Sequence, residues 1–478
     1  MGRRIDRQAT TGILRRSVRL PTLLTIILGA AAVGCSGPPP SVAEPQQWLR
    51  ASTNGHHLVL GDGVPFVIQA DSAWWLGERS TREDVVRYLD VRRGQGFNTV
   101  MFIATFDFGK GRNPYGETIW NGDASQPNPA FFEHIDFIVN EAEARGMHVA
   151  IAPAWVKHVT PPRGEGLNVQ NAYGFGQWVG QRYRGHPVIW IMGGDDENWH
   201  VPIVNEVARG LTHGVTGSDT GHDGVVITYH PAWAESSANR FHDEDWLDFN
   251  MTQSGHCGRT LTAGHQLTAE DFARRPPKPT MDGESLYEGH PLCMDPAQPY
   301  STAQEVRNGL YNGVFGGGTG IAYGHHSVWQ MYQPDRKGVN GPRQPWYEAL
   351  TDEAATQAVH LRALLTSRPI LTRTPQGSNG TAAAGTRTTG AEDGTYVMVY
   401  SAAGNPVTVD LDRLSGRTAR LWWYDPRTGA ATDAGTVPSA GALTVAPPDA
   451  RDWVLVADDA DSEFPPPGEY LDQPIDTY

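Results

Sequence analysis

The sequence predicts an α/β protein, a (β/α)8 TIM barrel followed by a small antiparallel β-sandwich domain. Three observations predict this fold. Eight short apolar runs alternate with helical or loop segments between about residues 66 and 323, the pattern of parallel strands joined by crossover helices. No glycine-rich phosphate loop follows the first run, which disfavours the alternative of an open doubly wound sheet. Beyond residue 370, this pattern of strands and helices gives way to short segments of alternating apolar and polar residues, which are typical of antiparallel strands.

The first 34 residues are typical of an export signal. Six arginines precede an apolar run from Leu20 to Val33, which is shorter than a membrane span requires. The run ends in Ala32-Val33-Gly34-Cys35, which resembles a bacterial lipobox, where cleavage before the cysteine leaves its thiol to be acylated. We expect an exported protein, either a cell-surface or periplasmic lipoprotein anchored through Cys35 or a secreted one. Residues 35–50 form a spacer.

The barrel is predicted over residues 51–370. A hairpin is expected around Gly61-Asp62-Gly63. A capping box at residues 80–83 opens a helix that stops at Gly96, and Asn128-Pro129 begins another that ends at Gly146. The eight expected strands are Phe66–Ile68, Thr99–Ile103, Val149–Ala152, Val188–Met192, Val225–Thr228, Trp246–Phe249, Pro279–Met281 and Gly320–Tyr323.

The β-sandwich is predicted over residues 371–457. A turn is expected at residues 425–429. The tail 458–478 has acidic residues and prolines but no Lys or Arg, so it is expected to be disordered. The strands expected in the β-sandwich are Tyr396–Tyr400, Val407–Leu411, Ala419–Tyr424 and Trp453–Val456.

The net charge excludes one class of partner. At −15 the chain repels phosphate backbones, so nucleic acid is not expected to bind. Residues 1–34 carry six Arg and one Asp, so their removal lowers the charge to −20. With Cys35 assigned to lipid, Cys257 and Cys293 are an even pair, which leaves a disulfide or two unpaired thiols open.

Catalytic groups of such barrels lie at the carboxyl ends of strands. The fourth run ends in Gly193-Gly194-Asp195-Asp196, and the seventh is followed by Gly283-Glu284. A single acid here would most often cap a helix, but two glycine-flanked carboxylates fit a retaining glycosidase, which holds them about 5–5.5 Å apart. The candidate catalytic residues are therefore Asp195 and Glu284.

Other strand ends carry aromatic and polar side chains suited to a sugar, because flat rings pack on its C–H faces and polar groups bind its hydroxyls. The adjacent pair His325-His326 could suggest a metal site, but neighbouring residues on a strand point to opposite faces, so no metal and no cofactor is predicted. The predicted substrate-binding residues are Asp71, Trp74, Trp75, Trp155, Tyr229, His230, Tyr323, His325, His326 and Trp329.

Several of these motifs, in this order, resemble the apiosidase-like family of glycoside hydrolases. The segments are Asp71–Trp74, Thr81–Thr99, Trp190–Asp195, Asp282–Glu288 and Tyr323–Gln330. Residues 422–429 and 452–455 resemble the collagen-binding-like β-domain that is usually appended to that family.

The resemblance implies a (β/α)8 barrel with retaining chemistry, in which Asp195 is the acid/base and Glu284 the nucleophile. The family often has Asn two residues after its catalytic Asp, a position that Asn198 holds relative to Asp196, so Asp196 is kept in reserve.

The resemblance also implies release of a terminal furanose such as apiose from a polysaccharide or oligosaccharide, with arabinofuranosidase or another exo-acting activity as alternatives. A non-catalytic glycan-binding lipoprotein that uses the same pocket is the other reading. The sequence contains no His-Glu-x-x-His motif and no Gly-x-Ser-x-Gly elbow, which argues against a protease. The membrane is expected as a partner only through the lipid anchor, and the oligomeric state is not predicted.

Overall fold

The structure is a computed structural model that describes residues 48–105, 111–155, 166–195, 197–219, 221, 223–257, 263–376 and 385–472. The predicted export signal, Cys35 and most of the spacer lie outside the described residues, and so does Asp196. In the part of the chain that is described, no helix is long and apolar enough to cross a membrane.

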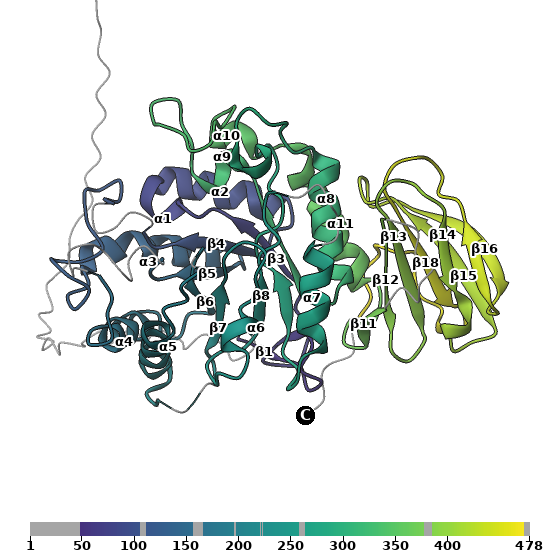
Figure 1. The fold of residues 1–478 in the computed structure, drawn as a ribbon, viewed down its shortest axis with the longest axis horizontal. Coiled ribbons are helices and arrows are strands. Elements are labelled where there is room, and N and C mark those ends of the chain that lie inside the picture. The colour runs from purple at the N-terminus through teal and green to yellow at the C-terminus, as the bar shows by residue number, and fades with distance from the viewer. Residues whose placement is uncertain are drawn as a thin grey trace, which may run out of the picture. The chain divides into compact units, whose positions relative to one another are not determined.

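Eight strands curl into the predicted barrel, which confirms the fold class (Figure 1). Six are hydrogen-bonded in the parallel order β10-β3-β4-β5-β6-β7, and β8 pairs with β9 in parallel. Thr319 N donates to Thr280 O at 2.7 Å and Thr228 Oγ1 to Phe249 O at 2.8 Å, which joins the two sheets. The strands are β3 (Ile68–Ser72), β4 (Thr99–Ile103), β5 (His148–Ala152), β6 (Val188–Gly193), β7 (Val226–His230), β8 (Asn250–Thr252), β9 (Thr280–Asp282) and β10 (Gly320–Gly324).

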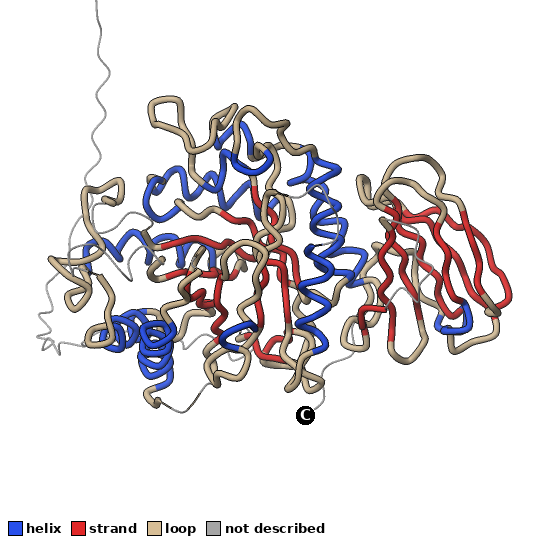
Figure 2. Tube along the Cα trace, in the orientation of Figure 1, coloured by secondary structure: helices blue, strands red, loops and turns tan. Residues whose placement is uncertain are grey.

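Helices connect the strands and cover the outside of the barrel (Figure 2). The first long helix begins with reciprocal capping between Thr81 and Asp84, one residue later than predicted. Asn128 caps the next one, as its Asn-Pro start predicts. The longer helices are α2 (Arg82–Gly94), α3 (Pro129–Glu143), α4 (Ala172–Arg182), α5 (Val201–Thr216), α7 (Ala263–Ala273), α8 (Ala303–Phe315) and α11 (Glu353–Thr366), and the short ones are α1 (Leu76–Arg79), α6 (Ala238–Phe241), α9 (His326–Trp329) and α10 (Trp346–Ala349).

The sixth strand lies later in the chain than its apolar run. The run 246–249 precedes β8 and is buried without being a strand, with Trp246 packed on Phe241 at 5.1 Å between ring centroids. β3 likewise begins two residues after the start of its predicted strand. An apolar run reports burial, so it locates a strand end only to within a few residues.

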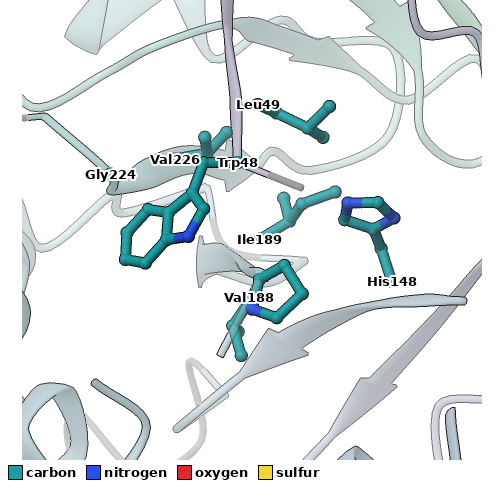
Figure 3. Close-up of a pocket in the computed structure, with 8 residues that line it drawn as sticks. Trp48, Leu49, His148, Val188, Ile189, Gly224 and Val226 are labelled. Atoms are coloured by element: carbon teal, nitrogen blue, oxygen red, sulfur yellow. The ribbon is translucent and has the colours of Figure 1, made fainter. Parts of the chain in front are cut away.

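A hairpin of β1 (Leu49–Ala51) and β2 (Leu58–Leu60) covers the amino-terminal end of the barrel. Trp48 lies against the backbone of Gly224, where an added Cβ would come within 2.1 Å of the indole ring. A small pocket between the hairpin and the first residues of β5, β6 and β7 is shown in Figure 3. It lies at the opposite end from the predicted catalytic residues. Its lining is Trp48, Leu49, His148, Pro187, Val188, Ile189, Gly224 and Val226.

The carboxyl-terminal domain consists of a six-stranded antiparallel sheet, in the order β11-β12-β13-β18-β15-β16, and a two-stranded sheet of β14 and β17. An apolar cluster that includes Val399, Val409 and Leu455 joins the two sheets, as expected for a sandwich. The strands are β11 (Arg373–Gln376), β12 (Thr386–Ala391), β13 (Tyr396–Ser401), β14 (Val407–Asp410), β15 (Thr418–Tyr424), β16 (Ala431–Pro438), β17 (Ala442–Val445) and β18 (Trp453–Asp459).

The tail differs from the expectation of disorder over 458–478. Asp458 and Asp459 complete β18, and Ser415 Oγ donates to Asp459 Oδ2 at 2.7 Å. A 3-10 turn (Ala460–Ser462) follows, and the structure describes the chain to residue 472. Composition alone does not predict that these residues are ordered, because pairing with neighbouring strands holds the first residues of the segment.

Candidate active site

Asp195 and Glu284 face one another at the carboxyl end of the barrel. Asp195 lies two residues after β6, and Glu284 lies two residues after β9. One oxygen of each carboxylate and one nitrogen of His230 all lie within 4.8 Å of one another. Two carboxylates this close match the short spacing of a retaining glycosidase better than the roughly 6.5–9.5 Å of an inverting one.

Two glycines let the chain turn sharply into Asp195. Gly193 and Gly194 have φ values of 78° and 122°, in the left-handed region. A Cβ on Gly193 would come within 2.3 Å of the Tyr229 ring, and one on Gly194 within 2.2 Å of the Trp155 ring. Side chains larger than hydrogen are therefore excluded here, and Asp195 itself is held at a φ of 49°.

Two histidines contact the buried carboxylate of Glu284. His256 Nε2 lies 2.9 Å from its Oε1, and His230 Nε2 lies 3.2 Å from its Oε2. Burial opposes ionisation of Glu284, but hydrogen bonds from His230 and His256 hold its pKa well below the ordinary value. Glu284 is therefore kept as an anion, the form that a nucleophile needs.

The two histidines supply their protons differently. Nδ1 of His256 accepts from the Tyr287 N–H at 3.5 Å, so a neutral His256 still presents an N–H to Glu284. Nδ1 of His230 instead lies 3.1 Å from the Pro231 carbonyl, to which it can only donate. His230 therefore carries a second proton facing Glu284 only as the cation. Burial lowers its pKa, but the contact with Glu284 and the charge of Asp195 raise it overall.

Asp195 keeps contact with solvent, unlike Glu284. Gln253 Nε2 donates to its Oδ1 at 3.1 Å. Partial removal from water and the negative charge of Glu284 nevertheless raise the pKa of Asp195, which is opposite to the shift at Glu284. Two carboxylates whose pKa values are pushed apart are suited to separate acid and nucleophile roles.

An aromatic wall lies beside the pair. The Trp74 ring lies 5.4 Å from that of Trp155 and 5.2 Å from that of His230, centroid to centroid. Trp74 Nε1 donates to the Tyr287 hydroxyl at 2.8 Å, and Trp329 packs against the same cluster. Of the predicted substrate-binding residues, the structure thus brings Trp74, Trp155 and His230 to the carboxylates, and Trp329 packs against the apolar cluster that contains the two tryptophans.

Three other predicted binding residues face the helices instead. Asp71 is fully buried and accepts from Arg92 Nε at 2.8 Å. Tyr229 stacks on Trp199 at 5.3 Å, and the Tyr323 hydroxyl donates to Glu288 at 2.7 Å. Successive side chains on a strand alternate between faces, so Tyr229 points outward because its neighbour His230 points inward.

The remaining predicted residues lie farther out in the loops. Trp75 packs on Trp329 at 5.1 Å and beneath the Arg79 guanidinium. His325 Nε2 contacts Asp352 at 3.0 Å, so it links the β10 end to the start of α11. His326 lies 4.3 Å from the His290 ring, and burial lowers its pKa to about 3.

Sequence reasoning missed Gln253, His256 and Tyr287. Gln253 and His256 follow β8, whose end was placed three residues too early by the apolar run 246–249. A strand ending at Thr252 would have brought both into the set of strand-end polar residues. Tyr287 lies within a motif that carried the family resemblance.

Asp195, His230 and Glu284 are close enough to converge on a metal ion. In this structure both histidines contact Glu284 directly, His230 Nε2 at 3.2 Å from Oε2 and His256 Nε2 at 2.9 Å from Oε1.

Cys257 and Cys293 lie side by side as free thiols. Cys293 Sγ lies 3.4 Å from the carbonyl oxygen of Cys257. Burial and the hydrogen bond to the Cys293 thiol raise the pKa of Cys257 to about 11. Of the two alternatives left open by the sequence, the structure has unpaired thiols.

Comparison with family profiles gives two matches. Residues 52–372 match "Apiosidase-like, catalytic domain", and residues 376–458 match "Putative collagen-binding domain of a collagenase". A comparison with curated proteins gave no match.

Solved structures give the same result. One described as "Glycoside hydrolase" is 28% identical, with a TM-score of 0.79 over 87% of this chain and 97% of its own. A glycoside hydrolase family 5 structure from Bacteroides vulgatus is 26% identical, with a TM-score of 0.80 over 90% of this chain and 96% of its own. A third structure, also from Bacteroides vulgatus, is 12% identical with a TM-score of 0.62 and shares the fold.

Proposed function

The chain belongs to the apiosidase-like family of glycoside hydrolases, and we propose that it is a retaining, exo-acting enzyme that releases a terminal apiose-like furanose from a polysaccharide. As a glycoside hydrolase, it acts on a carbohydrate. The observation that carries the proposed mechanism is the facing pair Asp195 and Glu284, whose pKa values shift in opposite directions.

In the first step, Glu284 attacks the anomeric carbon and forms an ester bond to the sugar. The glycosidic bond breaks as Asp195 gives its proton to the departing oxygen. His256 and His230 hold Glu284 ionised until the attack, and the histidine that faces the oxygen left as the ester carbonyl then donates to it.

In the second step, water replaces the leaving group. Asp195, now a carboxylate, takes a proton from this water while the water oxygen attacks the anomeric carbon. The ester bond breaks, and Glu284 returns to its anionic form. Two displacements at one carbon retain its configuration. The Gln253 amide orients Asp195 in both steps through its hydrogen bond to Oδ1.

The family resemblance suggests a furanose, and the buried aromatic wall of Trp74, Trp155 and Tyr287 supports binding of one terminal sugar. An arabinofuranosidase or another exo-acting specificity would use the same two carboxylates. The loops after the strands set such preferences, since barrels of this kind vary their substrates there.

The proposal is tested by incubating the full chain with aryl furanosides and apiose-bearing pectin fragments, beside Glu284→Gln. We expect sugar release by the wild type, and NMR of the first product should show the anomeric configuration of the substrate. An inverted product would rule out retention. A wild type no more active than the variant on every sugar would overturn the proposed function.

Asp195→Ala should affect poor leaving groups most, because only these need protonation. We expect kcat/KM on the glycan to fall by roughly 10²–10⁴-fold, and by much less on an aryl glycoside with an acidic phenol. The control is Asp243→Ala, at an exposed carboxylate in the loop before β8. Equal losses on both substrates would remove the acid role from Asp195.

The pH profile of kcat/KM should be bell-shaped, because the reaction needs an ionised Glu284 and a protonated Asp195. The lowered pKa of Glu284 places the acid limb below the ordinary 4.5, and the raised pKa of Asp195 places the alkaline limb above 3.8. On an activated aryl glycoside, Asp195→Ala should lose the alkaline limb and keep the acid limb. An unchanged alkaline limb would assign it to another group.

We also propose that the enzyme is exported and tethered through Cys35. The support is the arginine-rich leader and its lipobox-like end, and residues 1–34 and Cys35 lie outside the described residues. A tethered enzyme would meet polysaccharides outside the cell.

A further inference from the structure

Trp233 is an exposed tryptophan close to the carboxylate pair. It lies in the loop after β7, three residues beyond His230, and 56% of its side-chain surface faces solvent. Most tryptophans bury far more of their apolar surface. The proposed mechanism does not use this residue.

Backbone hydrogen bonds fix the Trp233 loop to the segment that follows β8. Ala234 N donates to Gln253 O at 2.9 Å, and Gln253 N donates to Glu235 O at 3.1 Å. The Gln253 side chain in turn donates to Asp195. These two backbone bonds place the Trp233 loop next to Gln253, the residue that orients the proposed acid Asp195.

The indole lies against the backbone of Gly255. A Cβ on Gly255 would lie 2.1 Å from Trp233 Cδ1 and 2.8 Å from its Nε1, and the φ of Gly255 is 72°. Gly255 N donates to the carbonyl oxygen of Glu284 at 2.9 Å. The ring is therefore seated on the same segment that holds the proposed nucleophile.

Gln253 and Ser254, which precede Gly255, point to opposite faces of this segment. Ser254, between Gln253 and Gly255, turns its hydroxyl to Asp282 at 2.6 Å, and Asp282 packs against Gly264 of α7 and Gly313 of α8. Ser254 therefore faces the helix layer. Gln253 reaches the other way to Asp195, and Trp233 covers the residue two positions farther on.

We propose that Trp233 is a stacking platform for the sugar on the leaving-group side of the scissile bond. The inference rests on the proposed function, since the leaving group departs from the side of the acid and Trp233 adjoins the residue that contacts Asp195. An exposed, seated indole offers a rigid flat face to sugar C–H groups at little entropic cost. The occupant is thus a sugar ring of the polymer, and not the furanose that is released.

The test compares two substrates that share the released sugar. One is an apiose-bearing pectin oligosaccharide, and the other is methyl apioside, whose leaving group carries no ring. Trp233→Ala should lower kcat/KM on the oligosaccharide about tenfold, mainly through KM, and at most about twofold on the methyl glycoside. Trp233→Phe, which keeps a flat ring, should recover part of the loss.

Tyr470→Ala is the matched control, because Tyr470 is 71% exposed and lies beyond the last strand of the β-sandwich. Its rates should equal those of the wild type. If Trp233→Ala lost kcat/KM equally on the two substrates, or lost none on the oligosaccharide, the proposed role of Trp233 would be overturned although the wild type is active. A wild type inactive on both substrates would overturn the proposed apiose specificity, and the platform would fall with it.

Discussion

Glu284→Gln is expected to lower kcat by roughly four orders of magnitude or more, because the amide cannot form the ester to the sugar. The change keeps the size of the side chain and the oxygen that accepts from His256. The protein should therefore still fold, which a melting curve checks. The measurement is release of a chromogenic phenol from an aryl furanoside, over time courses long enough to detect residual activity.

A matched control is Glu270→Gln, at an exposed carboxylate on α7 that contacts Gln266. Its kcat should equal that of the wild type. A second variant, Glu284→Gly, leaves space for azide, which should restore turnover and yield a glycosyl azide of inverted configuration, since one displacement then replaces two. Activity of Glu284→Gln within tenfold of the wild type would remove the nucleophile role from Glu284.

Asp71→Ala is expected to destabilise the barrel by about 3–5 kcal/mol, because it leaves the buried Arg92 guanidinium without its counter-charge. Tyr88 would also lose the carboxylate to which its hydroxyl donates at 2.5 Å. The hydrogen bond from Arg92 Nη1 to the Leu350 carbonyl at 2.9 Å would remain, but it does not neutralise the buried charge of the guanidinium. The measurement is the thermal midpoint, which should fall by roughly 5–15 °C.

The control is Asp90→Ala, which removes an ion pair of the same type at the surface. Asp90 lies 2.7 Å from Arg145, and its side chain is 60% exposed. Such pairs contribute about 0–1 kcal/mol, so the midpoint should hardly move. Equal shifts in midpoint for the two variants would show that Asp71 has no special structural role. If Asp71→Ala were stable but no longer bound the glycan, Asp71 would be a substrate-binding residue, as the sequence predicted.

Most of the fold could be predicted because its signals are local and strong. Asn128-Pro129 fixes a helix start through capping and a preset φ, and Thr99–Ile103 is a β-branched and apolar run that follows the polar Asn98. β16 and β17 could not be read this way. Their side chains are mostly exposed or half-buried, and only pairing with β15 and β14 makes them strands.

The candidate site was predicted less completely, because function depends on which face a side chain takes. Asp195 and Glu284 were found from glycine-flanked carboxylates at strand ends. Tyr229 and His230 were both assigned to the pocket, although adjacent strand residues cannot share a face. His256 depends on the exact end of β8, which a short apolar run does not define to within one residue.

The hairpin next to Trp48 affects how glycan and water reach the carboxylate pair. Among the described residues, the Trp48 indole and its neighbours cover the amino-terminal end of the barrel and apolar side chains fill the interior, so the carboxylate pair opens toward the carboxyl end. Glycan and water would then both enter at the carboxyl end of the barrel. In the proposed two-step reaction, the leaving group would therefore depart through the same opening by which the water of the second step enters.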